Sequence, residues 1–180
     1  MPKIINPLPS SDEIRAAFDY DLQTGVLSWK VRPVVPGDER ACNIFNSLFP
    51  GKPTGCPNGL GYLRILWRRK HYVAHRLAWK HYYGTEATLE IDHINGNRSD
   101  NRIANLREAT PSQNMANARF RPMNKNGFRG VRHRPDGTYQ ASIRKNGVGL
   151  HLGSFKTLEQ AAAAYQKAAK LIHGEFKPQD

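Results

Sequence analysis

The apolar residues of this 180-residue chain recur with two different periods. A period of two, interrupted by turn residues, predicts strands over VLSWKV, LGYLRILW and HYVA in the first third, and over GFRGVRHR, TYQASIRK and VGLHLGSF in the last third. Helical spacing predicts helices over HRLAWKHYYG and LEQAAAAYQKAAKLIHG, the second with an alanine-rich face that suits close packing on a sheet. We therefore expect an α+β fold.

Capping and turn residues mark the ends of these elements. Helix starts are indicated by a Ser or Thr followed three residues later by Glu or Gln, as in Ser10 with Glu13 before IRAAF, Thr110 with Gln113, and Thr157 with Gln160. Pro111 stands at the first helical position of the second of these, which strengthens that prediction. Residues 33–59 are rich in Pro, Gly and Asn, so we expect a loop there.

These elements divide the chain into three modules and a linker. A small N-terminal α/β scaffold is predicted over residues 1–74, followed by a central strand, loop, strand and helix over residues 75–120. A basic linker at residues 121–125 leads to residues 126–180, where two strong hairpin turns, PDG and NG, predict a three-stranded antiparallel sheet packed on one helix. At this length each module has only a small core.

The charge of the chain favours a polyanionic partner. The formal net charge is +12, and it is uneven: +4 over residues 1–74, +1 over 75–120 and +7 over 121–180. Double-stranded DNA is the expected partner, with the last third gripping phosphates. No apolar run approaches the ~20 residues of a membrane helix, and the N-terminus lacks a signal-peptide layout, so no membrane association and a cytoplasmic location are expected.

The run EIDHINGNRSDNRIANLREATPSQN carries the candidate chemistry. Asp92 and His93 end a predicted strand, a polar loop follows, and the LREA strand leads to the helix whose first turn holds Asn114. That order brings Asp92 and Asn114 towards one cavity. The set supplies two oxygen ligands for a hard cation, one titratable base and, in Asn105, one orienting amide, which are the groups needed to hydrolyse a phosphodiester.

Some residues of the chain suit other interpretations. A calcium loop at Asp92 fails because Ile94 occupies the position of the second oxygen ligand and no glutamate closes the loop. His75 is expected to be a helix-entry or packing residue, with a DNA contact or support of the site as the alternative. The basic residues of the LRILWRRK turn, Arg64, Arg68, Arg69 and Lys70, suit either phosphate contacts or a solvated turn.

The central residues resemble the HNH endonucleases of the ββα-metal fold, in particular the homing-type phage branch. That family has an Asp-His pair, an Asn thirteen residues after the Asp, and a His or Asn nine residues further on; Asp92, His93, Asn105 and Asn114 match it. The resemblance implies that Asp92 and Asn114 bind the metal, that His93 is the general base, and that Asn105 holds the loop and the ring of His93. One divalent ion is implied, with Mg²⁺ the best fit and Mn²⁺ a substitute.

The last module resembles the plant ethylene-response-factor DNA-binding domain of the APETALA type. FRGVR, LGSF, EQAAAAY and HGEF all correspond, although Tyr139 replaces the usual tryptophan and Gln140 a small residue. The resemblance implies that the sheet enters the major groove and that its DNA contacts are Arg129, Arg132, Arg134, Tyr139 and Arg144. Arg119 and Arg121, in the stretch ANARFRPMNKN between the two modules, are expected to follow the DNA backbone. An arginine face that only solubilises the sheet is the alternative.

Two functions from different classes follow. The favoured one is a metal-dependent DNA endonuclease, a monomer if it nicks one strand, acting in the host cytoplasm if it is phage-encoded. The alternative is a DNA-binding regulator that retains the nuclease fold without activity. The intact set of Asp92, His93, Asn105 and Asn114 favours the enzyme.

Overall fold

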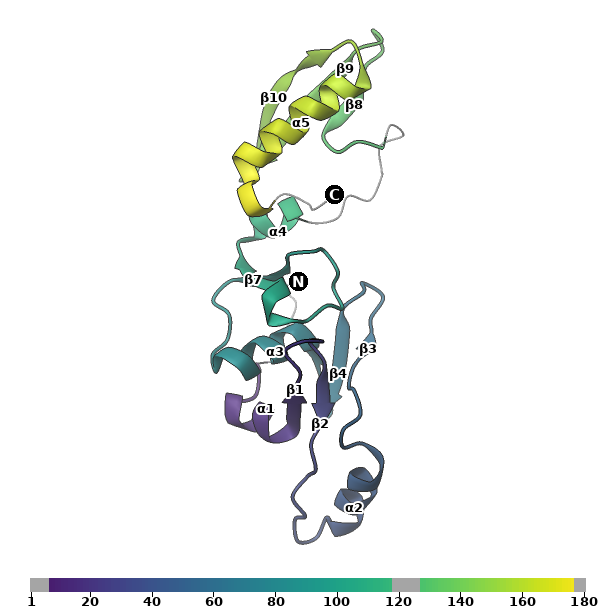
Figure 1. Cartoon of the computed structure of the whole chain (residues 1–180), viewed down its shortest axis with the longest axis vertical. Helices are drawn as coiled ribbons and strands as arrows, with labels where there is room; N and C mark the ends of the chain where they lie inside the picture. The colour runs from purple at the N-terminus through teal and green to yellow at the C-terminus, as the bar shows by residue number, and fades with distance from the viewer. Residues whose placement is uncertain (1–6, 118–126, 177–180) are drawn as a thin grey trace. The chain divides into compact units, whose positions relative to one another are not determined.

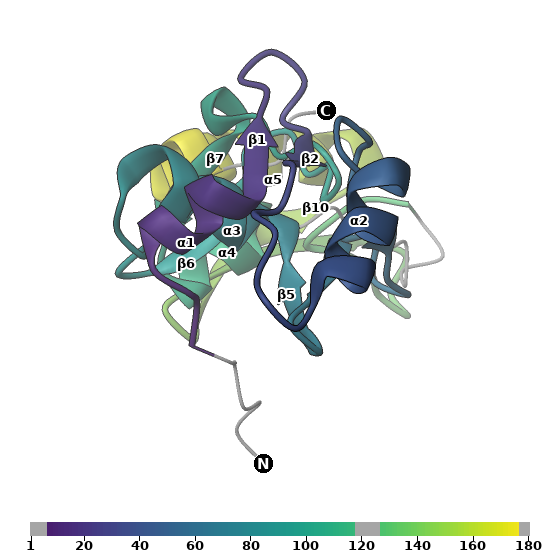
Figure 2. The same ribbon diagram turned by 90° about the horizontal axis from the view of Figure 1, so that it is seen from below.

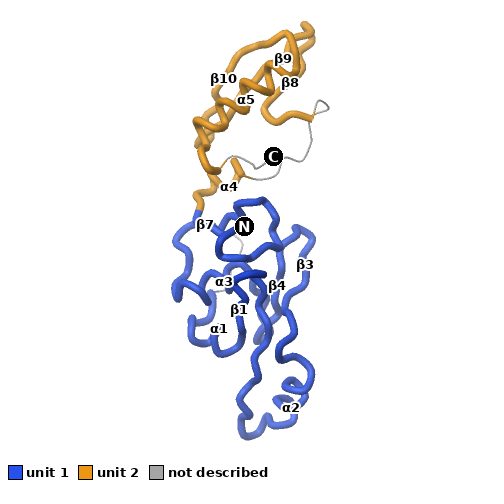
Figure 3. The backbone as a smooth tube through the Cα atoms, viewed as in Figure 1, with its two compact units in different colours: residues 1–108 blue, residues 109–180 orange. Residues whose placement is uncertain are grey.

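The computed structural model describes residues 7–117 and 127–176 (Figure 1). The chain forms two compact units, residues 1–108 and residues 109–180 (Figure 3). Helices and strands are both present, and the predicted α+β class is confirmed. The first unit contains the predicted scaffold and the two strands of the central motif. The last residue of the second strand, Ala109, is the first residue of the second unit.

The first unit contains short strands in three sheets. Its elements are α1 (Ser11–Ala17), β1 (Phe18–Tyr20), β2 (Leu27–Trp29), α2 (Glu39–Leu48), β3 (Cys56–Pro57), β4 (Leu63–Trp67), β5 (Lys70–Val73), α3 (Ala74–Tyr83), β6 (Glu90–His93), the 3-10 turn η1 (Ile103–Asn105) and β7 (Leu106–Ala109). β1 pairs antiparallel with β2, β3-β4-β5 form an antiparallel sheet, and β6 lies beside β7. Ser10 and Glu13 form the predicted capping box of α1.

A hydrophobic core joins α1, β1, β2, β4, β5 and α3. Ile14 of α1, Phe18 of β1 and Leu77 of α3 are completely buried in it, and α1 packs against α3 (Figure 2). Phe18 was predicted as the last residue of the first helix, but its φ of −133° and ψ of 141° place it in a strand. Its ring packs edge-on to Trp67, with centroids 5.0 Å apart. This tertiary contact outweighs the local helical preference.

The prediction of a loop over residues 33–59 is wrong for its central part. Glu39–Leu48 form the helix α2, and a short strand, β3, follows it. Phe45 of α2 packs edge-on to Trp29, with centroids 5.4 Å apart, and the guanidinium of Arg32 lies 3.4 Å from the centre of the Phe45 ring. Packing on Trp29 therefore stabilises α2, a helix that the surrounding Pro, Gly and Asn residues made hard to predict.

The second unit is a three-stranded sheet, one long helix and a short helix before them. Its elements are α4 (Pro111–Asn117), β8 (Val131–His133), β9 (Tyr139–Lys145), β10 (Val148–Phe155), α5 (Leu158–His173) and the 3-10 turn η2 (Gly174–Phe176). The sheet is antiparallel in the order β10-β9-β8. The C-terminal sheet packed on one helix is therefore confirmed.

Small residues allow α5 to approach this sheet closely. Ala161 and Ala162 are buried, and Ala161 contacts the core residues Val131 and Ala141. Gly130 has a φ of +69°, and a Cβ at this position would collide with the ring of Tyr165 and with the carbonyl oxygen of Ser142. Only glycine fits there, because the conformation is left-handed and the space is already occupied.

Among the described residues, no helix combines the length and apolar character needed to cross a bilayer.

Candidate active site

Asp92 and His93 end strand β6 and are both buried, with 5% and 4% of their surfaces exposed. Beyond them the chain leaves the strand, and its return is closed by a backbone hydrogen bond of 2.9 Å from the N–H of Ile94 to the carbonyl of Asn105. β7 begins directly afterwards, beside β6. The predicted order of strand, loop and strand is confirmed, and it places the Asp-His pair at the base of the loop.

Asn105 holds this loop through its side chain. Its Oδ1 accepts a hydrogen bond of 3.0 Å from the N–H of Asn95, and its Nδ2 donates one of 2.8 Å to the carbonyl of Asp100. Asn105 is buried, with 6% of its surface exposed. Its amide thus fixes both limbs of the loop that follows His93.

The amide beside the His93 ring belongs to Asn101, which no pattern in the sequence singles out. His93 Nε2 lies 3.2 Å from Asn101 Oδ1, and Asn101 is almost completely buried, with 2% of its surface exposed. One of several asparagines in a polar loop gives no local signal of this contact. Only the folded loop distinguishes Asn101 from its neighbours.

Other rings surround His93. The centroid of His75 lies 5.1 Å from that of His93 with the two planes perpendicular, and that of Tyr62 lies 5.9 Å away. Burial lowers the pKa of His93 below its usual value, while the hydrogen bond to Asn101 and the charge of Asp92 act in the opposite direction. A lowered pKa keeps this imidazole neutral at physiological pH, the form that can accept a proton.

Asp92 is paired with Arg107 of strand β7. Both Nε and one terminal nitrogen of Arg107 lie 2.9 Å from Asp92 Oδ2, and both side chains are largely buried. The donor set fits a hard divalent cation, for which a charged carboxylate oxygen held at a buried strand end is a suitable ligand.

Asn114 lies on α4 and therefore in the second unit, while Asp92, His93 and Asn105 lie in the first. Thr110 and Gln113 form the predicted cap: Gln113 N–H donates to Thr110 Oγ1 at 3.3 Å, and Thr110 N–H donates to Gln113 Oε1 at 2.8 Å. Asn114 is half-buried in the first turn of this helix. The helix start is thus where the sequence predicts it.

Within the second unit, the sheet presents a polar face opposite α5. On β9, Ala141 and Ile143 are buried, so Gln140, Ser142 and Arg144 lie on the other face. Arg132 of β8 is exposed and pairs in register with Gln140, and Arg134 donates a hydrogen bond of 2.6 Å to Gln140 Oε1. Arg132, Arg134 and Arg144 are thus associated with one exposed face.

Tyr139 and Arg129 make other contacts. Tyr139 alternates with Ala141 onto the core face of the sheet, where it packs against the cluster of Val131, Ala141 and Ala161. The guanidinium of Arg129 donates hydrogen bonds of 2.8 and 2.9 Å to the carbonyls of Ala116 and Met115 at the end of α4. Tyr139 therefore packs in the core and Arg129 caps α4. Neither side chain lies on the exposed face that carries Arg132 and Arg144.

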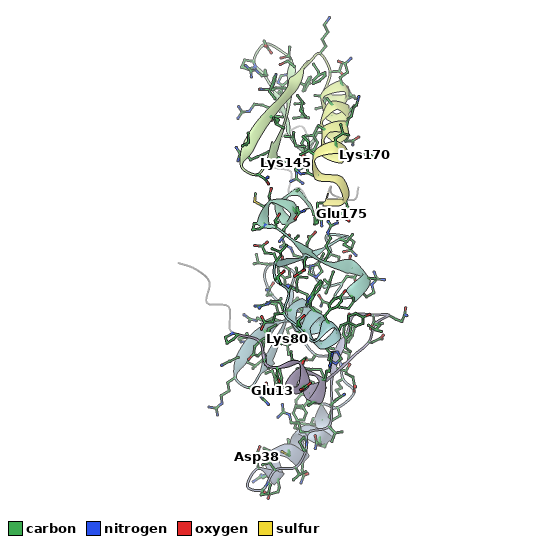
Figure 4. The ribbon with its side chains drawn as sticks, turned by 90° about the vertical axis from the view of Figure 1, so that its left-hand side faces the viewer. Glu13, Asp38, Lys80, Lys145, Lys170 and Glu175 are labelled. Carbon is green, nitrogen blue, oxygen red and sulfur yellow. The ribbon has the colours of Figure 1, made fainter. Side chains whose placement is uncertain are left out.

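The remaining predicted phosphate contacts are Arg119 and Arg121, which lie outside the described residues. In the basic turn between β4 and β5, Arg68 and Arg69 have φ values of 50° and 61°. Arg68 pairs with Glu13, which lies on α1 (Figure 4), so part of this turn is engaged within the protein.

Comparison with known proteins bears on both parts of the chain. The HNH endonuclease family model matches residues 72–116. An uncharacterised HNH endonuclease of Acanthamoeba polyphaga mimivirus is 38% identical over 88 residues, which cover 49% of this chain and 45% of the viral protein. No solved structure matches the chain.

A second group of relatives corresponds to the C-terminal part. Ethylene-responsive transcription factor 1 of Solanum lycopersicum is 48% identical over 50 residues, which cover 26% of this chain and 20% of the plant protein. An ethylene-responsive transcription factor of Arabidopsis thaliana is 44% identical over 66 residues, covering 34% and 42%. The chain spans less than half the length of each of these curated relatives. Its residues 72–116 match the HNH endonuclease family, and its C-terminal part is similar to ethylene-responsive transcription factors.

Proposed function

We propose that the chain is a divalent-metal-dependent endonuclease that hydrolyses DNA phosphodiester bonds. The observation that carries this proposal is the buried Asp92-His93 pair, whose imidazole is fixed by Asn101 within the segment that matches the HNH endonuclease model. The proposed subunit is a monomer that nicks one strand. The proposed enzyme is phage-encoded, of homing type, and acts in the host cytoplasm; the viral source of one relative fits an origin of this kind.

In the proposed reaction His93 is the general base. Donation of its Nε2–H to Asn101 Oδ1 leaves the lone pair on Nδ1, which takes a proton from water. The water oxygen forms a bond to phosphorus as the bond from phosphorus to the 3′ oxygen breaks, and the leaving oxygen is protonated from solvent. Asn105 serves this step by holding the loop that contains Asn101.

Asp92 and Asn114 are the proposed metal ligands. A bound Mg²⁺, or Mn²⁺ in its place, supplies positive charge that offsets the charge developing on the leaving oxygen. Arg107 orients the Asp92 carboxylate through its two contacts to Oδ2. No second carboxylate is required, since water and phosphate oxygens can complete the coordination of a hard cation.

Duplex DNA is the proposed ligand of the C-terminal sheet. Arg132, Arg134 and Arg144 would contact its phosphates and base edges from the exposed face. Tyr139 and Arg129 would support that face from within, and Arg119 and Arg121 would follow the backbone. A tethered DNA-binding module raises the local concentration of the cleaving site near DNA.

The first test is conversion of supercoiled plasmid by the wild type and by His93→Ala, with Mg²⁺, with Mn²⁺ and with EDTA. We expect metal-dependent conversion to open circles, lowered at least ~100-fold in His93→Ala because the base is lost. His71→Ala, which removes an exposed histidine on β5, is the matched control and should nick like the wild type. DNA binding by gel shift should persist in both variants.

The similarity to transcription factors favours a second candidate, a DNA-binding regulator without nuclease activity. Gel shifts without cleavage of any of several DNAs, by wild type and His93→Ala alike, would support this candidate over the nuclease. A linear product would instead show that two active sites act together.

A further inference from the structure

We propose that the turn at residues 21–26, between β1 and β2 of the N-terminal segment, positions Asn101 and through it His93. This inference rests on the proposed nuclease function and extends the catalytic machinery beyond the HNH domain. It makes Tyr20 and Gly25 positioning residues, although both lie about seventy residues before the Asp-His pair.

The turn is held rigidly by its own hydrogen bonds. The Asp21 carboxylate accepts from the N–H of Gln23 at 2.8 Å and from the hydroxyl of Thr24 at 2.7 Å. The backbone closes through a bond of 2.8 Å from Gly25 N–H to the Asp21 carbonyl and one of 3.0 Å from Asp21 N–H to the Val26 carbonyl. A turn fixed in this way can transmit a steric constraint to its neighbours.

Gly25 carries the turn directly against the nuclease loop. Its φ is +72°, and a Cβ at this position would collide with the backbone nitrogen of Arg102 and the carbonyl carbon of Asn101. Two backbone segments therefore lie in contact with no side chain between them. The glycine is required for this approach as well as for the left-handed conformation.

Tyr20 makes a second, directional contact with the same residue. Its hydroxyl donates a hydrogen bond of 2.7 Å to the backbone carbonyl of Asn101. Burial raises the pKa of Tyr20 to about 12, so the hydroxyl remains a donor at physiological pH. Asn101 is thus held at its backbone by the N-terminal segment, while its side chain holds His93 Nε2.

This arrangement bears on the reaction because the position of Asn101 Oδ1 selects which imidazole nitrogen carries the proton. A displacement of about 1 Å in a catalytic group can lower the rate about 100-fold. The N-terminal segment therefore contributes to turnover without touching the substrate.

The first arm of the test compares Gly25→Ala with Gly51→Ala in the full-length protein. Gly51 has a similar φ of +74°, but nothing lies within 4 Å of a Cβ there, so the control imposes the same backbone strain without the collision. We expect the nicking kcat of Gly25→Ala to fall about 100-fold with KM changed less than about threefold. Gly51→Ala should retain the wild-type kcat where it is folded.

The second arm keeps the proposal testable if Gly25→Ala does not fold. Tyr20→Phe removes only the hydroxyl, and Tyr72→Phe is its control, since Tyr72 is buried in the same core and packs on Trp67. We expect Tyr20→Phe to lower kcat about tenfold at unchanged KM. The ¹⁵N shifts of the His93 ring should move towards a mixture of tautomers in Tyr20→Phe and stay unchanged in Tyr72→Phe.

The outcomes separate the two proposals. If the wild type nicks and Tyr20→Phe matches Tyr72→Phe in both kcat and ring shifts, the positioning role is overturned while the nuclease stands. If the wild type does not nick, the proposed function itself fails. If the His93 shifts nevertheless respond to Tyr20→Phe, the structural link from Tyr20 to His93 is supported without the reaction.

Discussion

At the scale of single residues, His75 is a half-buried histidine with one fully buried ring nitrogen. Its Nδ1 has no hydrogen bond within the described residues, and its ring stands perpendicular to that of His93. Burial, with the nearby His93 and Arg76, lowers the pKa of His75 to about 3. The folded protein therefore keeps this ring neutral over a pH range in which the unfolded chain is protonated.

This difference predicts a pH dependence of stability. Between the unfolded pKa of ~6.5 and the folded value of about 3, the unfolded chain binds the extra proton. Stability is thus fully present above ~6.5 and falls as the pH is lowered, by up to ~1.4 kcal/mol per pH unit from this group.

Thermal unfolding of the wild type and His75→Phe between pH 8 and pH 4 measures this contribution. Phe keeps the ring but cannot take up the proton, so the wild type should lose more stability on acidification than the variant. Parallel curves for the two proteins would show that His75 is protonated equally in both states.

The residues of the candidate site differ in how far the sequence could reveal them. Asp92, His93, Asn105 and Asn114 were predicted because their spacing along one segment is itself the signal. Asn101 was missed because asparagines are common in turns, and Tyr20 because its bond to Asn101 spans 81 positions. A partner that is distant in sequence has no local pattern to mark it.

At the scale of elements, helices and strands were predictable where apolar and polar residues alternate regularly and where strong caps or turns mark the ends. β9, β10 and α5 were predicted almost residue by residue, because two hairpin turns and the Thr157 cap delimit them. α2 was missed because only Cys42 is buried in it and its N-cap, Asp38, makes no side-chain capping bond. A short helix stabilised by one aromatic contact leaves little trace in the sequence.

That explanation predicts that α2 depends on Phe45. Phe45→Ala removes the contacts to Trp29 and to the Arg32 guanidinium and should lower the free energy of unfolding by about 2 kcal/mol. Ile44→Ala, at an exposed position of the same helix, should cost less than about 0.5 kcal/mol. Urea unfolding of both variants checks this, and equal losses would show that helix propensity matters more than packing.

At the scale of the whole molecule, the excess positive charge is concentrated towards the C-terminus, as expected for a chain that binds a polyanion there. The +7 of residues 121–180 includes the arginines of the exposed sheet face and also lysines elsewhere, such as Lys170 in the last turn of α5 (Figure 4). Because α5 packs on the opposite face of the sheet, these two groups of charges can be separated experimentally.

We predict that Arg132→Ala with Arg144→Ala weakens duplex binding more than about tenfold and lowers the slope of log K against log salt by about 2, one unit for each lost phosphate contact. Lys170→Ala should change both quantities little. Fluorescence anisotropy at several salt concentrations provides the measurement. A loss in the Lys170 variant as large as in the double variant would place the binding surface elsewhere.

The contact between Gly25 and the backbone of Asn101 and Arg102 has a consequence for the evolution of such chains. A gene fragment encoding only residues 72–116 would carry the recognisable motif. It would lack Gly25 and the turn against which the loop of this motif packs. Recombination that exchanged this fragment alone would transfer the loop after His93 without the turn at residues 21–26 that contacts it. The segment needed for the proposed activity is then longer than the segment that matches the family, and successful exchanges should carry the preceding residues with it.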